Sequence, residues 1–346
     1  MNNKVRLMDI KNEAEKKRVI SFLDESFGLG YDEDTEQTLV VERGDSIVAT
    51  ASFSGNVIKQ IAIDEKFRGE GLTAPLLGET VREMLSRGRS HIFVFTKPAN
   101  IEIFKGLGFR KVGGTLTDAA LLEWGSEGID KYKKELAISR FGEEGSASAV
   151  VVNCNPFTKG HRHLIECASS ESEAVYVFVV ETEKSLFQFD ERIEMVREGV
   201  KDLVNVAVLP GGQYIISSAT FPSYFTHSKD LLRVQTELDA EIFAEHIAPV
   251  LGIEKRWVGR EPYCQVTETY NNALKKILGL YNIKLSVINR IKEDEKIVSA
   301  SAVREALRMG DMDTVRKMVP QTTWEYISSE RAKHTIEKIK KTLSRH

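Results

Sequence analysis

The stretch Asn153-Cys154-Asn155-Pro156-Phe157-Thr158-Lys159-Gly160-His161 decides the fold of this chain. It follows an apolar run and precedes a helical pattern, so it is predicted to be the turn between a strand and a helix. Such a turn gathers backbone N–H groups and the positive end of a helix, which attract phosphate. Gly160 permits close approach of the backbone, and Thr158 and His161 offer side-chain donors three residues apart. A plainer interpretation, a Thr158 N-cap and a surface histidine, also fits this turn.

The residues around this turn predict a parallel sheet. Short β-branched runs lie at Ala149–Cys154, Val175–Val180, Val206–Leu209, Arg256–Gly259 and Leu285–Ile288. Helical patterns separate them at His161–Ser170, Glu191–Leu203, Lys229–Leu251 and Thr267–Leu280. Alternation of apolar strands with helices predicts an α/β domain with both faces of the sheet covered. Ligands bind such sheets at the carboxyl ends of the strands.

A second segment, Val298-Ser299-Ala300-Ser301-Ala302-Val303-Arg304, follows the last predicted strand and opens another helix. Ser299 and Ser301 are natural N-cap residues. Arg304 lies one turn further, where its guanidinium can reach an anion at the helix start. Taken alone, the segment also fits an ordinary capped helix with a solvated arginine.

Together, Thr158-Lys159-Gly160-His161 and Ser299–Arg304 resemble the two signatures of the HxGH nucleotidyltransferase superfamily, with Thr158 in a position where many members have histidine. The resemblance implies a Rossmann-like domain that positions ATP for attack at its α-phosphate. It implies that His161, with Thr158 beside it, contacts the α- and β-phosphates. The β- and γ-phosphates would then contact Ser299, Ser301 and Arg304. Asn155, Phe157 and Gly160 in this turn are expected to bind the nucleotide, with Mg²⁺ held by the phosphates and water without a dedicated protein metal site. Gly259, at the end of the fourth predicted strand, is expected to let the adenine or ribose pack there, although a glycine at a tight turn fits equally.

Further segments are similar to the citrate lyase ligase family over essentially the whole chain. They are Phe189-Asp190-Glu191-Arg192, in which Asp190 is a predicted N-cap, Gly211–Phe225, Val258–Cys264 and Thr267–Asn271. This resemblance implies that acetate and ATP give acetyl-AMP and pyrophosphate. The acetyl group then passes to the thiol of a phosphoribosyl-dephospho-coenzyme A arm on the acyl carrier subunit of citrate lyase. Ser217–Phe225 is the predicted region for acetate and thiol.

The first part of the chain has another pattern. Strands are predicted at Val5–Leu7, Thr38–Val41, Ser46–Phe53, Gln60–Ile63 and His91–Thr96, with helices at Leu72–Arg87 and Ile101–Leu107. These predict an α+β domain with a mainly antiparallel sheet. The loop Arg68-Gly69-Glu70-Gly71 resembles the coenzyme A pyrophosphate loop of GNAT-type N-acetyltransferases, although Lys66 departs from that pattern. We expect this domain to hold the coenzyme A-like arm.

Composition sets further limits. The 346 residues predict two domains, since single cores rarely exceed about 300 residues. A charged, Gly- and Ser-ending stretch at 126–148 predicts their boundary, with domains 1–140 and 141–346. A net charge of −3 disfavours nucleic acid, and three scattered cysteines disfavour a disulfide framework. With no signal-like or spanning apolar run, we expect a cytoplasmic protein without membrane contact.

Two alternatives stay open at this point. One is a cofactor-making adenylyltransferase acting on pantetheine phosphate or nicotinamide mononucleotide, whose substrate is a phosphate instead of a carboxylate. The other is a GNAT acetyltransferase or acyl-sensing protein whose second domain only senses nucleotide.

Overall fold

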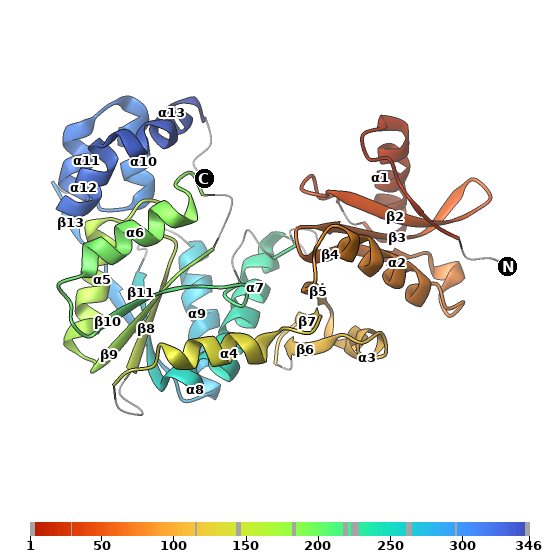
Figure 1. The fold of residues 1–346 in the computed structure, drawn as a ribbon, viewed down its shortest axis with the longest axis horizontal. Coiled ribbons are helices and arrows are strands. Elements are labelled where there is room, and N and C mark those ends of the chain that lie inside the picture. Colours follow the sequence, from red (N-terminus) through yellow and green to blue (C-terminus); the bar gives the residue numbers. More distant parts are fainter. Residues whose placement is uncertain are drawn as a thin grey trace. The chain divides into compact units, whose positions relative to one another are not determined.

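The computed structural model describes residues 4–28, 30–114, 116–142, 147–181, 185–216, 221–222, 228–260, 265–294 and 296–342. The chain forms two compact units, Met1–Lys131 with Phe221–Leu238, and Tyr132–Thr220 with Asp239–His346 (Figure 1). The boundary predicted between residues 140 and 141 stays a prediction. In the structure, the first unit also includes a segment from much later in the chain.

The first unit contains a seven-stranded sheet in the order β1-β2-β3-β4-β5-β7-β6. Its strands are β1 (Val5–Leu7), β2 (Gln37–Arg43), β3 (Ser46–Ser54), β4 (Val57–Ile63), β5 (Ile92–Thr96), β6 (Arg110–Gly113) and β7 (Ala120–Trp124). Its helices include α1 (Glu13–Phe27), α2 (Thr73–Ser86) and α3 (Ile101–Lys105). Neighbouring strands pair antiparallel except β4 and β5, which pair in parallel through Val57–Ile58 and Phe93–Val94 only. The predicted α+β class is confirmed.

The second unit contains five parallel strands in the order β10-β9-β8-β11-β12. They are β8 (Ala147–Val152), β9 (Ala174–Val179), β10 (Val206–Pro210), β11 (Ile253–Arg260) and β12 (Lys284–Asn289). A short hairpin joins β13 (Lys292–Glu293) to β14 (Lys296–Ile297). Because the first and fourth strands are neighbours, the strand order reverses at β8 and β11. The carboxyl ends of these two strands therefore form the crevice where ligands bind in such folds.

Helices cover both faces of this sheet, as predicted. The helices that follow the first unit's sheet in the chain are α4 (Ile129–Ile138), α5 (Lys159–Ser170), α6 (Phe189–Val200), α7 (Ser228–Ile242), α8 (Ala248–Leu251), α9 (Gln265–Leu280), α10 (Ala300–Met309), α11 (Met312–Met318), α12 (Gln321–Ser328) and α13 (Lys333–Lys341). One apolar cluster joins α5, α6 and α10 to the sheet, and a second joins α8 and α9 to the opposite face. Alternate residues of β8 divide between them, since Val150 enters the first cluster and Ala149 the second.

The helix expected over Lys229–Leu251 is confirmed, since helical structure runs without a gap through α7, a π-helical turn at Phe243–Ile247, and α8. Pro249 lies at the start of α8, where its missing N–H and its ring interrupt the regular ladder. Asp190 is not an N-cap, because α6 begins at Phe189 and is capped by Gln188. In the described part of the chain, no helix is long and apolar enough to cross a membrane.

Candidate active site

The turn between β8 and α5 is closed by a capping box in which a histidine replaces the usual glutamate or glutamine. The Thr158 hydroxyl accepts from the backbone N–H of His161 at 3.4 Å. In return, His161 Nδ1 accepts from the backbone N–H of Thr158 at 3.1 Å, and the Thr158 hydroxyl lies 3.0 Å from the same Nδ1. Thr158 is buried, and the contact of its hydroxyl with Nδ1 fixes the orientation of the His161 ring.

These contacts determine the chemistry of His161. Because Nδ1 accepts the backbone N–H, the ring proton of the neutral histidine is on Nε2. Burial, with a smaller contribution from the charge of Arg290, lowers the pKa of His161 from 6.5 to about 4. His161 is therefore a neutral donor at the positive end of α5.

The two sequence motifs meet in the structure. Arg304 on α10 donates from Nη1 to the backbone carbonyl of Asn155 at 2.5 Å. A Cβ atom added to Gly160 would lie 3.1 Å from the carbonyl oxygen of Val298. The start of α5 and the segment leading into α10 are thus in contact, although about 140 residues separate them in the chain. Helix starts that attract anions come together at this edge of the sheet.

The second motif forms its own cap. Ser299 is the N-cap of α10, and its hydroxyl accepts from the backbone N–H of Ala302 at 3.1 Å. The Ser301 hydroxyl lies 3.0 Å from that of Ser299, and Ser301 is exposed. Burial, together with the charge of Arg308, lowers the pKa of Arg304. The phosphate contacts of these three residues stay predictions.

Asn155 and Phe157 brace the turn. The side-chain carbonyl of Asn155 accepts from the backbone N–H of Phe187 at 3.0 Å. Phe157 is fully buried in the core, and its ring stacks on that of His161 with centroids 6.0 Å apart. Both are predicted to contact nucleotide, and these predictions remain untested. The side chain of Phe157 has a packing role here.

Gly259 lies inside β11 with neither a positive φ nor a tight neighbour. Among the residues that the structure describes, a Cβ atom there would meet only Arg290, with Nε at 3.9 Å. The glycine is therefore not required by the backbone or by packing. The predicted nucleotide contact of Gly259 stays a prediction.

Sequence reasoning missed three cations beside this site. Arg290 follows β12 and lies close to both Gly259 and His161. Lys159, within the quoted motif, forms an ion pair with Glu293 at 3.6 Å. Arg192 on α6 is fully buried and donates to the carbonyls of Asn153 and Val180 at 2.7 and 2.8 Å, at the ends of β8 and β9. In the sequence, the position of Arg290 directly after β12, the last strand of the parallel sheet, was the signal that could have identified it as a site residue.

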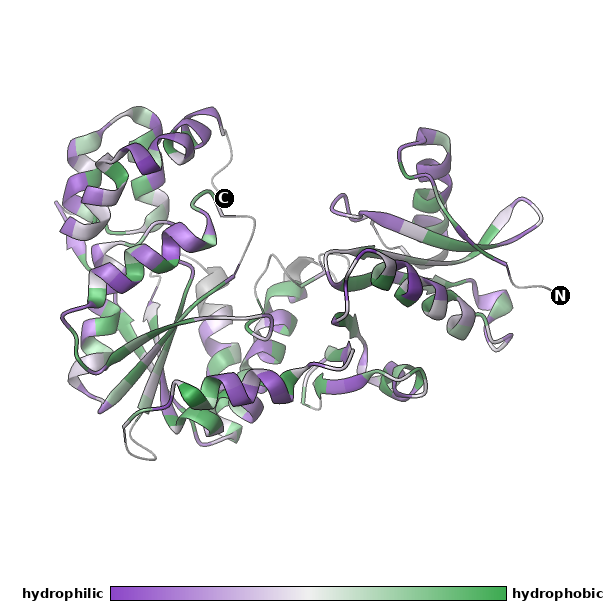
Figure 2. Cartoon of the chain, in the orientation of Figure 1, coloured by the Kyte–Doolittle hydropathy of each residue, from purple (hydrophilic) through white to green (hydrophobic). Residues whose placement is uncertain are grey.

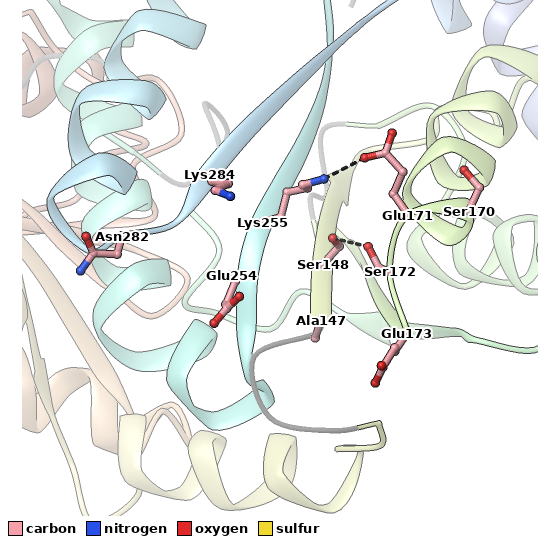
Figure 3. Close-up of a pocket in the computed structure, with 10 residues that line it drawn as sticks. All are labelled: Ala147, Ser148, Ser170, Glu171, Ser172, Glu173, Glu254, Lys255, Asn282 and Lys284. Atoms are coloured by element: carbon pink, nitrogen blue, oxygen red, sulfur yellow. Dashed lines mark hydrogen bonds and ion pairs between the residues drawn. The ribbon is translucent and has the colours of Figure 1, made fainter.

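A hollow of about 480 Å³ lies at the other edge of this sheet (Figure 3). Ala147, Glu254 and Lys284 line it, at or near the first residues of their strands. Lys255 pairs there with Glu171 at 2.9 Å. Because this is the amino edge, the hollow is separate from the candidate active site.

In the first unit, the loop Arg68–Gly71 has the predicted open backbone. Gly69 and Gly71 have φ angles of +87° and +74°, and a Cβ added at either would have no atom of the described residues within 4 Å. Helix α2, which follows, has no side-chain hydrogen bond at its N-cap. Arg68 is exposed and pairs with Glu65 at 3.1 Å.

Two further predictions concern ligands. Most of Ser217–Phe225, the predicted region for acetate and thiol, lies outside the described residues. Within the described residues, no three His, Cys, Asp or Glu side chains form a group that could hold a metal ion.

Several known proteins are similar to this chain. The citrate lyase ligase C-terminal domain family matches residues 147–327. The chain is 34% identical over 328 residues to the citrate (pro-3S)-lyase ligase of Klebsiella pneumoniae, covering 93% of this chain and 95% of the relative. It is 35% identical over 332 residues to that of Haemophilus influenzae, covering 92% and 97%. A crystal structure of the ribosomal-protein-S18-alanine N-acetyltransferase from Escherichia coli matches 36% of this chain and 97% of its own, with 14% identity and a TM-score of 0.30.

Proposed function

The chain belongs to the citrate lyase ligase family, and from that premise we propose that the carboxyl edge of its second sheet binds ATP and activates acetate as acetyl-AMP. The observation that carries the proposal is the 2.5 Å hydrogen bond from Arg304 to the carbonyl of Asn155. It joins two helix starts, a guanidinium and a histidine N–H at one edge, which is the set of donors that a triphosphate needs.

The proposed chemistry follows from these charges. A carboxylate oxygen of acetate attacks the α-phosphorus, an O–P bond forms, and the bond to the β-phosphate oxygen breaks as pyrophosphate leaves. Negative charge then spreads over the phosphate oxygens, which Nε2–H of His161 and the guanidinium of Arg304 stabilise. The carboxylate is already deprotonated, so this step needs no general base. Mg²⁺ on the triphosphate would neutralise further charge, held mainly by phosphate oxygens and water.

The second step uses the carrier subunit of citrate lyase. The sulfur of its coenzyme A-like arm attacks the acetyl carbon, a C–S bond forms, and the C–O bond to AMP breaks. The thiol proton passes to solvent and AMP leaves. We assign binding of the arm's pyrophosphate to the loop Arg68–Gly71, because its glycines expose backbone N–H groups beside the uncapped start of α2.

Exchange of labelled pyrophosphate into ATP tests the first step without the carrier. We expect exchange that requires acetate and is unaffected by pantetheine phosphate. Exchange that requires a phosphate substrate would instead support a cofactor-making adenylyltransferase, and absence of exchange with either would overturn the proposal. Formation of acetyl-AMP, detected by mass spectrometry, provides a second measurement.

A further inference from the structure

Positive charge is concentrated at the end of the second unit. Residues 331–342 contain the basic residues Arg331, Lys333, Lys338, Lys340 and Lys341 against a single acid, Glu337, while the whole chain has a net charge of −3. Figure 2 shows the corresponding hydrophilic colour along α13. The charge of this helix is thus opposite to that of the whole protein.

Some of these basic side chains form ion pairs within the described part of the chain, and others do not. Arg331 pairs with Glu194, and Lys333 with Glu330. Lys338, Lys340 and Lys341 are exposed, and none of them has an ion pair in the part of the chain that the structure describes. A lysine near the C-terminus of a helix interacts favourably with the helix dipole, but this interaction is weak when the lysine is exposed.

Two arginines on α10 connect the basic end of α13 to the candidate active site. Arg308 donates from Nε to the carbonyl of Thr342, directly after α13, at 3.0 Å. Along α10, Arg308 lies one turn from Arg304, which donates to the carbonyl of Asn155 in the phosphate turn. The charge of Arg308 is close enough to lower the pKa of Arg304, after the larger effect of burial. A row of two arginines, Arg304 and Arg308, with Arg308 paired to Glu305, therefore leads from the phosphate turn to the C-terminal end of α13.

An exposed apolar residue lies beside this row. Met309, the last residue of α10, is 75% exposed. Helices α10 and α13 pack against each other (Figure 1). A single exposed apolar residue is ordinary on a protein surface, so the positive charge is what distinguishes this region.

We propose that Lys338, Lys340 and Lys341, here termed the basic face, bind an acidic surface of the carrier subunit. This inference rests on the proposed function, in which the carrier must bring its thiol to an adenylate at the neighbouring phosphate turn. Charge complementarity identifies the partner surface as acidic. Such charges mainly raise the rate of encounter and give it a dependence on salt.

The test compares two double charge reversals of equal size. Lys338→Glu with Lys341→Glu changes the basic face, whereas Lys275→Glu with Lys284→Glu changes exposed lysines on α9 and at the amino edge of the sheet. Binding of purified carrier is measured by calorimetry at low and high salt. We expect the first variant to bind at least about fivefold more weakly at low salt, with reduced salt dependence, and the second to bind within about twofold of the unmodified protein.

Two further measurements make the result unambiguous. Acetate-dependent pyrophosphate exchange needs no carrier, so both variants should retain it. Lys338→Gln with Lys341→Gln, which removes charge without reversing it, should have an intermediate effect on binding. Equal weakening by both reversals, or unchanged binding in the first, would overturn the docking proposal. If the unmodified protein showed no acetate-dependent exchange, the proposed function would be contradicted. The docking proposal would still be tested, because carrier binding is measured without turnover.

Discussion

The Nδ1 atom of His161 accepts a hydrogen bond from the backbone N–H of Thr158 at 3.1 Å, so a helix cap determines which nitrogen of the histidine carries its proton. A capping residue normally satisfies the helix and nothing more. Here the same hydrogen bond leaves Nε2–H as the donor. The start of α5 and the proposed chemistry therefore depend on one side chain.

Replacing His161 should separate these two roles. Glutamine is a usual residue at this position of a capping box, so His161→Gln should keep stability but misplace the donor. His161→Ala loses both the cap and the donor. We expect pyrophosphate exchange to fall by about 10²–10³ in both variants, and the free energy of unfolding to fall by about 1 kcal/mol only in the alanine variant. His163→Ala, two residues along the same helix, is the control, and an equal loss of exchange there would contradict the assignment.

The pH dependence follows from the lowered pKa of His161. Its pKa of about 4 in the folded protein lies below 6.5, so the unfolded chain binds more protons between these values. The contribution of His161 to stability is therefore complete above about pH 6.5 and is lost as the pH falls toward 4. Thermal unfolding from pH 4 to 8 should show a steeper loss on acidification in the unmodified protein than in His161→Gln. Nitrogen NMR shifts showing a charged ring at pH 6 would exclude this explanation.

Much of the architecture could be predicted because its signals are local. The runs Val175–Val180 and Val206–Leu209 lie within one residue of β9 and β10, since buried parallel strands are continuous apolar segments. Helix α1 was missed, although Asn12 caps it, because its charged sequence has only a weak apolar stripe. The extent of the helix over Lys229–Leu251 was predicted, but its π-helical turn at Phe243–Ile247 was not, because a hydrophobic pattern does not distinguish the two helical geometries.

The site was only partly predictable, because hydrogen-bond direction is not a property of sequence spacing. Thr158 and His161 could be selected from the motif, but the motif does not show that the threonine hydroxyl holds the histidine. The spacing of residues in the sequence does not predict that Arg290 and Arg192 lie at the site. Their positions depend on strand order, which brings β12 and α6 to the same edge.

Two glycines of the site should respond differently to the same change. Gly160→Ala puts a Cβ 3.1 Å from the carbonyl of Val298, which must shift, so we expect lower stability, by about 1–3 kcal/mol, and weaker exchange. Within the described part of the chain, the Cβ of Gly259→Ala meets only the flexible Arg290 at 3.9 Å, so the change should leave thermal stability unchanged. Gly259→Val should raise the Michaelis constant for ATP without changing the unfolding temperature by more than a few degrees. An unchanged Michaelis constant would remove Gly259 from the nucleotide site.

The loop of the first unit makes a separate prediction. Gly69→Val and Gly71→Val should raise the Michaelis constant for the carrier and spare acetate-dependent exchange. Gly88→Val is a matched control, because Gly88 also has a positive φ, +78°, with no atom within 4 Å of an added Cβ. Each of the three changes should cost about 1–2 kcal/mol of backbone strain, so the control removes the effect of stability. If carrier kinetics were equal in all three variants, the loop would have no special part in binding the arm.

Arg304 gives the last test, since its guanidinium both joins the two motifs and is proposed to bind phosphate. Arg304→Met removes the charge and leaves the carbonyl of Asn155 without this donor, which costs about 1 kcal/mol of stability. Arg304→Lys keeps a charge but loses the planar geometry that holds two oxygens at once. If the role is only structural, the two variants should lose exchange in proportion to their loss of stability. If Arg304 binds phosphate, the methionine variant should lose about 10²-fold in exchange, the lysine variant should recover part of it, and pyrophosphate should inhibit both less than the unmodified protein.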